Sequence, residues 1–196
     1  MGALIGGVLG LIILGIMALV RSSKAKAHAA GMQQALSVGG TGGRAALDKR
    51  LPAARSLFGD VEVARQSERI AALATLGELD AVDAEMAAYA GSTLHVATAR
   101  SIGRVALALH GRDPAGQLAA LEADVQALAA QGTNKLSLRA VASLVPVVRA
   151  LGGAPSPTEA ERAEALRFQP SPVIQRLLGE AFAKADARTS PRPSAS

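Results

Sequence analysis

An unbroken apolar run covers residues 3–20, and no side chain in it carries a charge. At about 1.5 Å rise per residue, a helix over this run covers roughly 27 Å, close to the bilayer hydrocarbon thickness of about 30 Å. A helix in the core of a globular domain would carry polar residues on one face, and this run has none. We therefore predict a single transmembrane helix, an anchor over residues 1–21.

The residues that flank the apolar run predict its orientation. Met1 and Gly2 precede it without a basic residue, whereas a cleavable secretory signal, which is the alternative, would begin with one. Arg21, Lys24 and Lys26 follow the run, so the positive-inside rule places this flank in the cytoplasm, in contact with the lipid surface. Abundant alanine and arginine are typical of GC-rich bacterial genomes. We therefore expect a single-pass protein of the bacterial inner membrane, with its N-terminus outside and its main domain cytoplasmic.

Glycines recur within the apolar run. Gly6 and Gly10 are four residues apart and share one helical face, an arrangement that lets two membrane helices pack closely. Such packing would allow a homo-oligomer to form through this helix. Glycine is also common in membrane helices without such a role, which is the alternative interpretation of this pair.

Residues 22–43 are expected to form a basic juxtamembrane helix that ends in a glycine-rich hinge. The hinge is predicted at residues 37–43, because a stretch so rich in glycine favours flexible chain over regular structure. A phosphate-binding loop is the alternative interpretation. It would need a Gly-Lys-Ser or Gly-Lys-Thr ending, whereas Gly43 is followed here by Arg44 and Ala45.

Composition predicts an all-α domain over residues 44–188. Hydrophobic residues make up 49% of the chain but aromatic residues only 2%, so that the core must consist of Leu, Val, Ile and much Ala. Such a core favours close-packed helices over a sheet, which would need more β-branched and aromatic residues. The last segment, residues 189–196, is polar and proline-rich, and we expect it to be a disordered tail.

Apolar residues in this domain recur at three- and four-residue steps, which indicates amphipathic helices. Leu118, Leu121, Val125 and Leu128 form one such stripe. Glycine and proline residues between the stripes mark the helix ends. We predict helices near residues 44–58, 60–76, 79–90, 93–110, 114–131, 134–151, 157–168 and 172–186.

Prolines refine these boundaries. Asp113 before Pro114 is a typical N-cap with proline at the first helical position, and residues 156–159 (Ser-Pro-Thr-Glu) have the pattern of a capping box. Pro52 and Pro146 fall inside predicted helices and should each kink or restart them.

Two turns are related by a regular spacing. Gly77 and Gly111 are 34 residues apart, and residues 71–80 align with residues 105–114 without a gap. This spacing resembles the tetratricopeptide repeat, whose two helices meet at such a glycine. The resemblance covers residues 60–151. It implies antiparallel helix pairs stacked as a short α-solenoid, or else an irregular bundle, with a concave surface that binds peptides or proteins.

The sequence has no recognisable catalytic or metal-binding motif. His28, His95 and His110 are not spaced as metal ligands, the chain has no Cys, and no serine lies in a Gly-x-Ser-x-Gly motif. We therefore expect no cofactor and no enzymatic activity. Nucleic-acid binding is also disfavoured, because a dense basic face with stacking aromatic residues is absent.

Two charged clusters remain. The acidic residues between Glu78 and Glu85 stand at the start of a predicted helix, where negative charge complements the helix dipole. Arg100 and Arg104 are one helical turn apart, either as a small anion-binding patch or as part of a solvated face.

These features together predict a membrane-tethered scaffold or adaptor. Its partners would be membrane lipid and another protein, which the helical domain would recruit to the inner membrane face. A periplasmic chaperone-like domain is the alternative if the topology is reversed. An enzyme or ligand binder remains a further alternative, with a site assembled from residues distant in sequence.

Overall fold

The computed structural model describes residues 27–28, 30–53, 60–88, 96–132, 135–169 and 171–189. Within these ranges the chain is helical without strands, which confirms the predicted all-α character. The helices are α2 (Gly40–Arg50), α3 (Asp60–Thr75), α4 (Leu79–Ala88), α5 (Ala97–Leu109), α6 (Pro114–Ala130), α7 (Lys135–Ala142), α8 (Val145–Leu151), α9 (Glu159–Phe168) and α10 (Pro172–Thr189).

The prediction of a fold with a membrane-spanning helix has to be corrected. None of the helices in the described ranges combines the length and the apolar character that crossing a bilayer requires. Even α10, with 18 residues, is amphipathic and carries charged residues such as Arg176 and Glu180 on its exposed side. An inner-membrane location is therefore not supported. The residues on which these predictions rested lie outside the described residues: residues 1–21 with Gly6 and Gly10, and the cations Arg21, Lys24 and Lys26.

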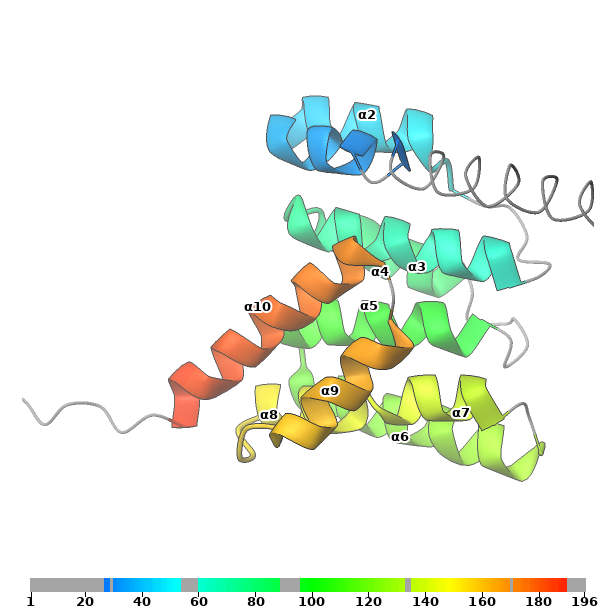
Figure 1. The fold of residues 1–196 in the computed structure, drawn as a ribbon, viewed down its shortest axis with the longest axis vertical. Helices are drawn as coiled ribbons and strands as arrows, with labels where there is room; N and C mark the ends of the chain where they lie inside the picture. Colours follow the sequence, from blue (N-terminus) through cyan, green and yellow to red (C-terminus); the bar gives the residue numbers. More distant parts are fainter. Residues whose placement is uncertain are drawn as a thin grey trace, which may run out of the picture.

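The helices form a stack that is covered on one side (Figure 1). From one end to the other, α2 packs on α3, α3 on α5, and α5 on α8, while α4 and α6 pack against the same central helices. The C-terminal helix α10 runs obliquely across α3, α5 and α8. We call the side of these three helices on which α10 lies the inner face.

Two turns of the stack have the same geometry. Gly77 between α3 and α4 and Gly111 between α5 and α6 both have φ +79°, a conformation that glycine adopts without strain. In each turn the amide of the next residue, Glu78 or Arg112, donates to a carbonyl five positions back at 2.9 Å. Such Schellman turns reverse the chain and create antiparallel pairs. The resemblance to the tetratricopeptide repeat itself stays a prediction.

Local signals in the sequence place most helix ends correctly. Asp113 caps α6 by accepting a hydrogen bond from the Gly116 amide at 3.1 Å, and Pro146 lies where α8 restarts after α7. The capping box is shifted from its predicted position, because Thr158 is the N-cap of α9. The Thr158 hydroxyl accepts from the Glu161 amide, and the Glu161 carboxylate accepts from the Thr158 amide at 2.7 Å.

The predicted glycine hinge is helical for most of its length. Residues 30–38 are helical, the chain turns at Gly39 (φ 66°), and α2 begins at Gly40. Gly43 is buried, and a Cβ atom there would lie 2.7 Å from the Ala35 carbonyl oxygen and 3.0 Å from Leu76 Cδ2. The missing side chain at Gly43 therefore lets α2 lie close to the helical residues 30–38 and to the C-terminal end of α3. Helix propensity alone does not reveal this role of glycine.

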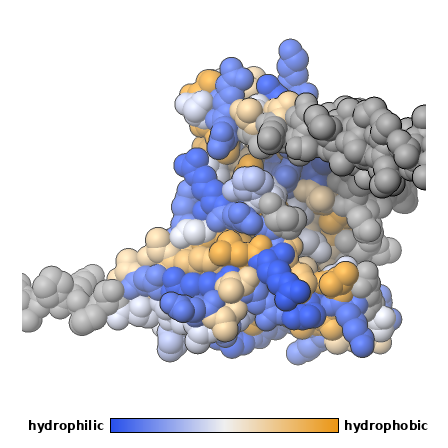
Figure 2. All heavy atoms as spheres, in the orientation of Figure 1, coloured by the Kyte–Doolittle hydropathy of each residue, from blue (hydrophilic) through white to orange (hydrophobic). Residues whose placement is uncertain are grey.

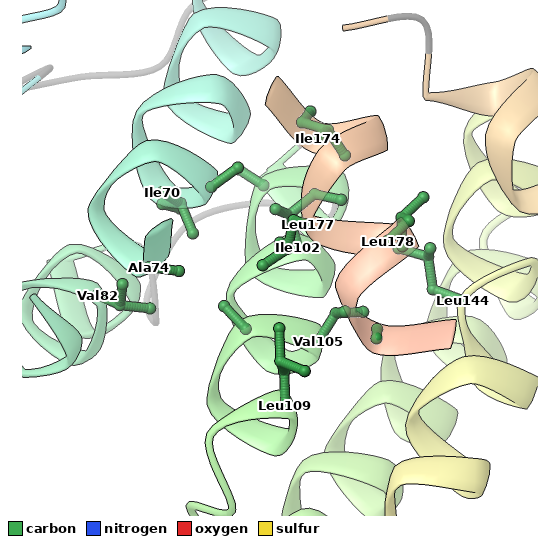
Figure 3. Packing of buried hydrophobic residues seen from close by; sticks show 14 of the residues in the cluster. Ile70, Ala74, Val82, Ile102, Val105, Leu109, Leu144, Ile174, Leu177 and Leu178 are labelled. Carbon is green, nitrogen blue, oxygen red and sulfur yellow. The ribbon is translucent and has the colours of Figure 1, made fainter. Parts of the chain in front are cut away.

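The core contains many alanines, as composition predicts. Ala71, Ala72, Ala74, Ala106 and Ala108 are all buried and allow α3 and α5 to pack closely. Figure 3 shows how larger apolar side chains fill the space between these helices and α10: Ile174, Leu177 and Leu178 of α10 point toward Ile70, Ile102, Val105 and Leu144. Burying each such side chain contributes roughly 1.5–3 kcal/mol.

Candidate interaction surface

The inner face is closed by α10. This helix buries one apolar side along its length against α3, α5 and α8. The residues it buries are Val173, Ile174, Leu177, Leu178, Ala181, Phe182 and Ala185. On this side of the stack, α10 therefore occupies the apolar surface that α3, α5 and α8 present.

Charged residues of α10 add to this closure. The Lys184 ammonium donates to the Leu109 carbonyl at the C-terminal end of α5, and the Arg188 guanidinium donates to the Leu151 carbonyl at the end of α8. Cations near helix C-termini interact favourably with unpaired carbonyls and with the helix dipole. Residues on two successive turns of α10 thus contact the ends of two neighbouring helices of the stack.

The connection between α9 and α10 is also held by charge. Arg162 makes a two-pronged ion pair with Asp186, at 2.9 and 2.5 Å, and its guanidinium lies 5.2 Å from the centroid of the Phe182 ring. The hydrogen bonds from Arg162 lower the pKa of the Asp186 carboxyl below its ordinary value. This pair fastens α10 to α9 in addition to the apolar contacts.

Arg100 and Arg104 are neither an anion site nor a solvated face. Both guanidinium groups donate to the Asp124 carboxylate of α6, each at 3.0 Å, and all three side chains are largely buried. The sequence places the two arginines on adjacent turns but does not reveal that Asp124, 24 and 20 residues later, supplies their counter-charge. These residues join α5 to α6.

The acidic cluster between Glu78 and Glu85 has a similar role. Asp80 lies in the first turn of α4, as predicted, and both Asp80 and Asp83 pair with Arg112 at 2.8 Å. Within the described residues no three potential ligands gather as a metal site. His28 contacts the Glu68 carboxylate at 2.9 Å, His110 caps α5, and His95 lies outside the described residues.

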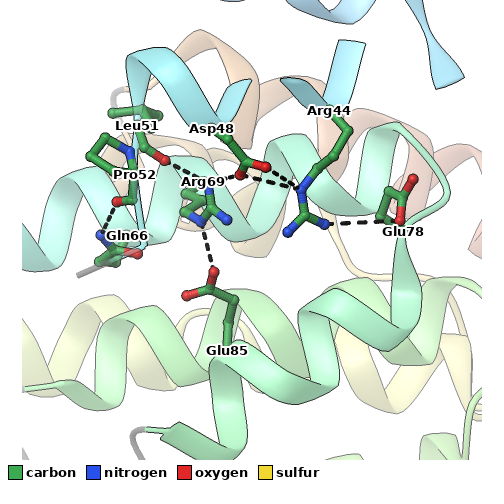
Figure 4. A network of polar contacts seen from close by, with 8 residues as sticks. All are labelled: Arg44, Asp48, Leu51, Pro52, Gln66, Arg69, Glu78 and Glu85. Carbon is green, nitrogen blue, oxygen red and sulfur yellow. Dashed lines mark hydrogen bonds and ion pairs between the residues drawn. The ribbon is translucent and has the colours of Figure 1, made fainter. Parts of the chain in front are cut away.

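A buried ion-pair network centred on Arg69 attaches α2 to α3 and α4 (Figure 4). The Arg69 side chain is 2% exposed and donates to Glu85 Oε1 and to the Leu51 carbonyl, at 2.7 and 2.5 Å; its guanidinium also lies 2.7 Å from Asp48 Oδ1. Burial alone would lower the pKa of Arg69, but the two carboxylates outweigh this effect and raise it. No local sequence signal marks Arg69 for this role, because its neighbours along the chain resemble those of other arginines on amphipathic helices.

A groove remains open at the end of the stack beyond α2. It lies between residues 31–38 and α2 and has a volume of about 460 Å³. Val38 on its wall is 62% exposed. Figure 2 shows orange apolar spheres among blue polar ones at this end of the molecule. We call this the terminal groove; it is lined by Gly31, Gln34, Ala35, Val38, Ala46, Lys49 and Arg50.

Comparison with known proteins finds no matching protein family, no similar curated protein and no similar solved structure.

Proposed function

We propose that this chain is a protein-interaction module that binds a helix of a partner protein in the terminal groove. One observation carries the proposal: the inner face is filled by α10, whereas the terminal groove is apolar and open in the part of the chain that the structure describes. The chain would then act as a scaffold or adaptor, in which the stacked helices hold the groove in shape.

The walls of the terminal groove have the spacing that a partner helix requires. Gly31, Ala35 and Val38 occupy successive turns of one wall, and Ala46 and Arg50 are one turn apart on the other. Helices pack by setting the side-chain ridges of one into the grooves of another, and small residues let the two backbones approach. Recognition of an amphipathic helix in an apolar groove is a common mode of peptide binding.

The position of the terminal groove at one end of the stack also favours binding of a partner helix. In arrays of stacked helices each element packs on its neighbours, and the last element exposes a face on which another helix could pack. Here α2 packs on α3 through Leu47, which is fully buried, while Ala46, Lys49 and Arg50 face away from the core. The terminal groove is therefore the surface at which the array can be extended.

Site-specific crosslinking tests this function. The chain has no Cys, so Val38→Cys creates a single attachment site for a benzophenone crosslinker in the terminal groove. Leu136→Cys on α7 is the matched control, because both side chains are 62% exposed. In cells that express the full chain, we expect a discrete adduct with one identified protein from position 38 and none from position 136.

A groove-filling variant provides the second control. The three atoms nearest to a Cβ atom at Gly31 all belong to the flexible Arg50 guanidinium, so Gly31→Leu should fold and place its side chain in the terminal groove. Circular dichroism checks the fold. The adduct from position 38 should disappear in this variant. Equal adducts from positions 38 and 136, or an adduct that survives Gly31→Leu, would overturn the proposal.

A further inference from the structure

We infer that the partner helix is acidic: an amphipathic helix that sets small apolar residues into the terminal groove and glutamate or aspartate side chains against Lys49 and Arg50. This inference rests on the proposed function and adds the chemistry of the partner. The observation behind it is that both cations lie on one wall of the terminal groove, exposed and in the last turn of α2.

Neither cation forms an ion pair with another described residue. Among the described residues no carboxylate lies within ion-pair distance of Lys49 or Arg50, whereas Arg44 of the same helix donates to Asp48 at 3.0 Å. The Arg50 guanidinium instead lies over Gly31 on the opposite wall, where a Cβ atom would be only 1.9 Å from Nη1. Arg50 therefore extends across the apolar floor of the groove.

This placement favours an anionic partner. The C-terminal end of α2 accounts for cations at this end of the helix, since they complement its dipole. The helix dipole does not, however, explain why the Arg50 guanidinium extends across the groove to Gly31. A carboxylate brought there by a partner would meet a positive charge at a site from which apolar surface excludes water, where Coulombic attraction exceeds its value in bulk solvent.

The two other candidate occupants do not match this charge. A second copy of the chain, packed groove against groove about a two-fold axis that passes beside Lys49 and Arg50, would bring these cations against the same two cations, and like charges disfavour that arrangement. The chain's own apolar residues 3–20 carry no acidic side chain and would leave both cations without a partner. An acidic helix satisfies both the apolar floor and the basic wall.

Two designed peptides test the inference on the purified full chain, kept monodisperse in non-ionic detergent because of the apolar residues 3–20. The probe is a fluorescein-labelled helical peptide of about four turns, with an Ala/Leu stripe and glutamates along one edge. The control peptide has lysines in place of the glutamates. Fluorescence anisotropy should show about tenfold tighter binding of the glutamate peptide, with the difference reduced by salt.

Charge reversal then tests the assigned residues. Lys49→Glu with Arg50→Glu should reverse the preference, so that the lysine peptide binds more tightly. The matched control is Lys135→Glu with Arg167→Glu, which makes the same change of charge at exposed positions on α7 and α9 and should leave the preference unaltered. A preference that persists after reversal at positions 49 and 50 would overturn the inference.

The remaining outcomes separate the inference from the proposed function. If the crosslink from position 38 reaches one identified protein but the two peptides bind equally or not at all, the acidic partner is wrong and the binding module stands. A crosslink from position 38 to a second copy, or to residues 3–20, would overturn both. A helical acidic segment at the crosslinked site of the partner would support both.

Discussion

The inner face and the terminal groove are two apolar surfaces of one helical stack, and they differ in what covers them. On the inner face α10 buries a continuous stripe and contacts the ends of α5 and α8 through Lys184 and Arg188. The terminal groove is also largely apolar, with smaller side chains such as Ala35, Val38 and Ala46 in its walls, yet Val38 remains 62% exposed. Apolar character alone therefore does not decide whether a surface becomes core. The difference is that α10 covers the inner face, whereas no helix of the described residues covers the terminal groove.

The strongest test of this contrast is truncation of one apolar side chain on each surface. Leu177 on α10 is fully buried, so we expect Leu177→Ala to reduce the free energy of unfolding by about 2–5 kcal/mol. Val38→Ala should change it by no more than about 0.5 kcal/mol. Urea denaturation followed by circular dichroism measures both. A comparable loss at Val38 would mean that the terminal groove is covered in the native protein.

The next largest effect concerns the attachment of α2. Arg69→Met should destabilise the chain by about 3 kcal/mol, because it leaves Glu85 buried opposite an apolar side chain. Amide hydrogen exchange should accelerate in α2 more than in α10. Adding Glu85→Met should recover part of the loss, and Arg167→Met at an exposed position is the control. Uniform acceleration in both helices would show that Arg69 does not act locally.

A smaller effect on stability is expected from removing the N-cap of α9, a cap that α2 lacks. Thr158→Ala removes the capping box of α9 and should cost about 1 kcal/mol, whereas Thr158→Ser keeps the hydroxyl and should cost less. The helix α2 has no such interaction to lose, since Gly39 makes no side-chain cap. Thermal unfolding monitors the change, and equal losses in the two variants would exclude the hydroxyl as the cause.

The smallest predicted effect is the loss of stability at acidic pH that depends on Asp48. Burial raises the pKa of Asp48, but hydrogen bonds from Arg69 and Arg44 outweigh this effect and lower it below the ordinary value of 3.8. A lowered pKa stabilises the fold above pH 3.8, and this contribution is lost as the pH falls below that value. Between pH 5 and pH 3 the melting temperature should therefore fall less in Asp48→Asn than in the unmodified chain. Parallel curves would contradict the ion-pair assignment.

Much of the local structure could be predicted from the sequence. Pro114, Pro146 and Pro172 lie where helices begin, and the 3.6-residue period marked the faces that the core buries. These signals act over a few residues, so they can be recognised without knowing the fold. The glycine-rich stretch misled the prediction, because helix propensity treats Gly43 as a weak position while the structure uses its missing side chain for close packing.

The candidate site could be predicted far less well. Lys49 and Arg50 lie within the basic N-terminal part of the chain, but nothing there indicates that they line a groove with residues 31–38. The pairing of Asp124 with Arg100 and Arg104 likewise joins residues on two different helices, α6 and α5. Such contacts depend on how helices are arranged, and the sequence carries no local signal for them.

The helical character of the described chain and most helix ends follow from local sequence signals, because hydrophobic period, caps and prolines act on neighbouring residues. Which apolar faces become core depends instead on how the helices pack. This packing places α10 over the inner face, buries Arg69 among carboxylates from α2 and α4, and leaves the terminal groove open. The reason is that burial is a property of contacts between residues far apart in the chain, and those contacts exist only after the helices have packed.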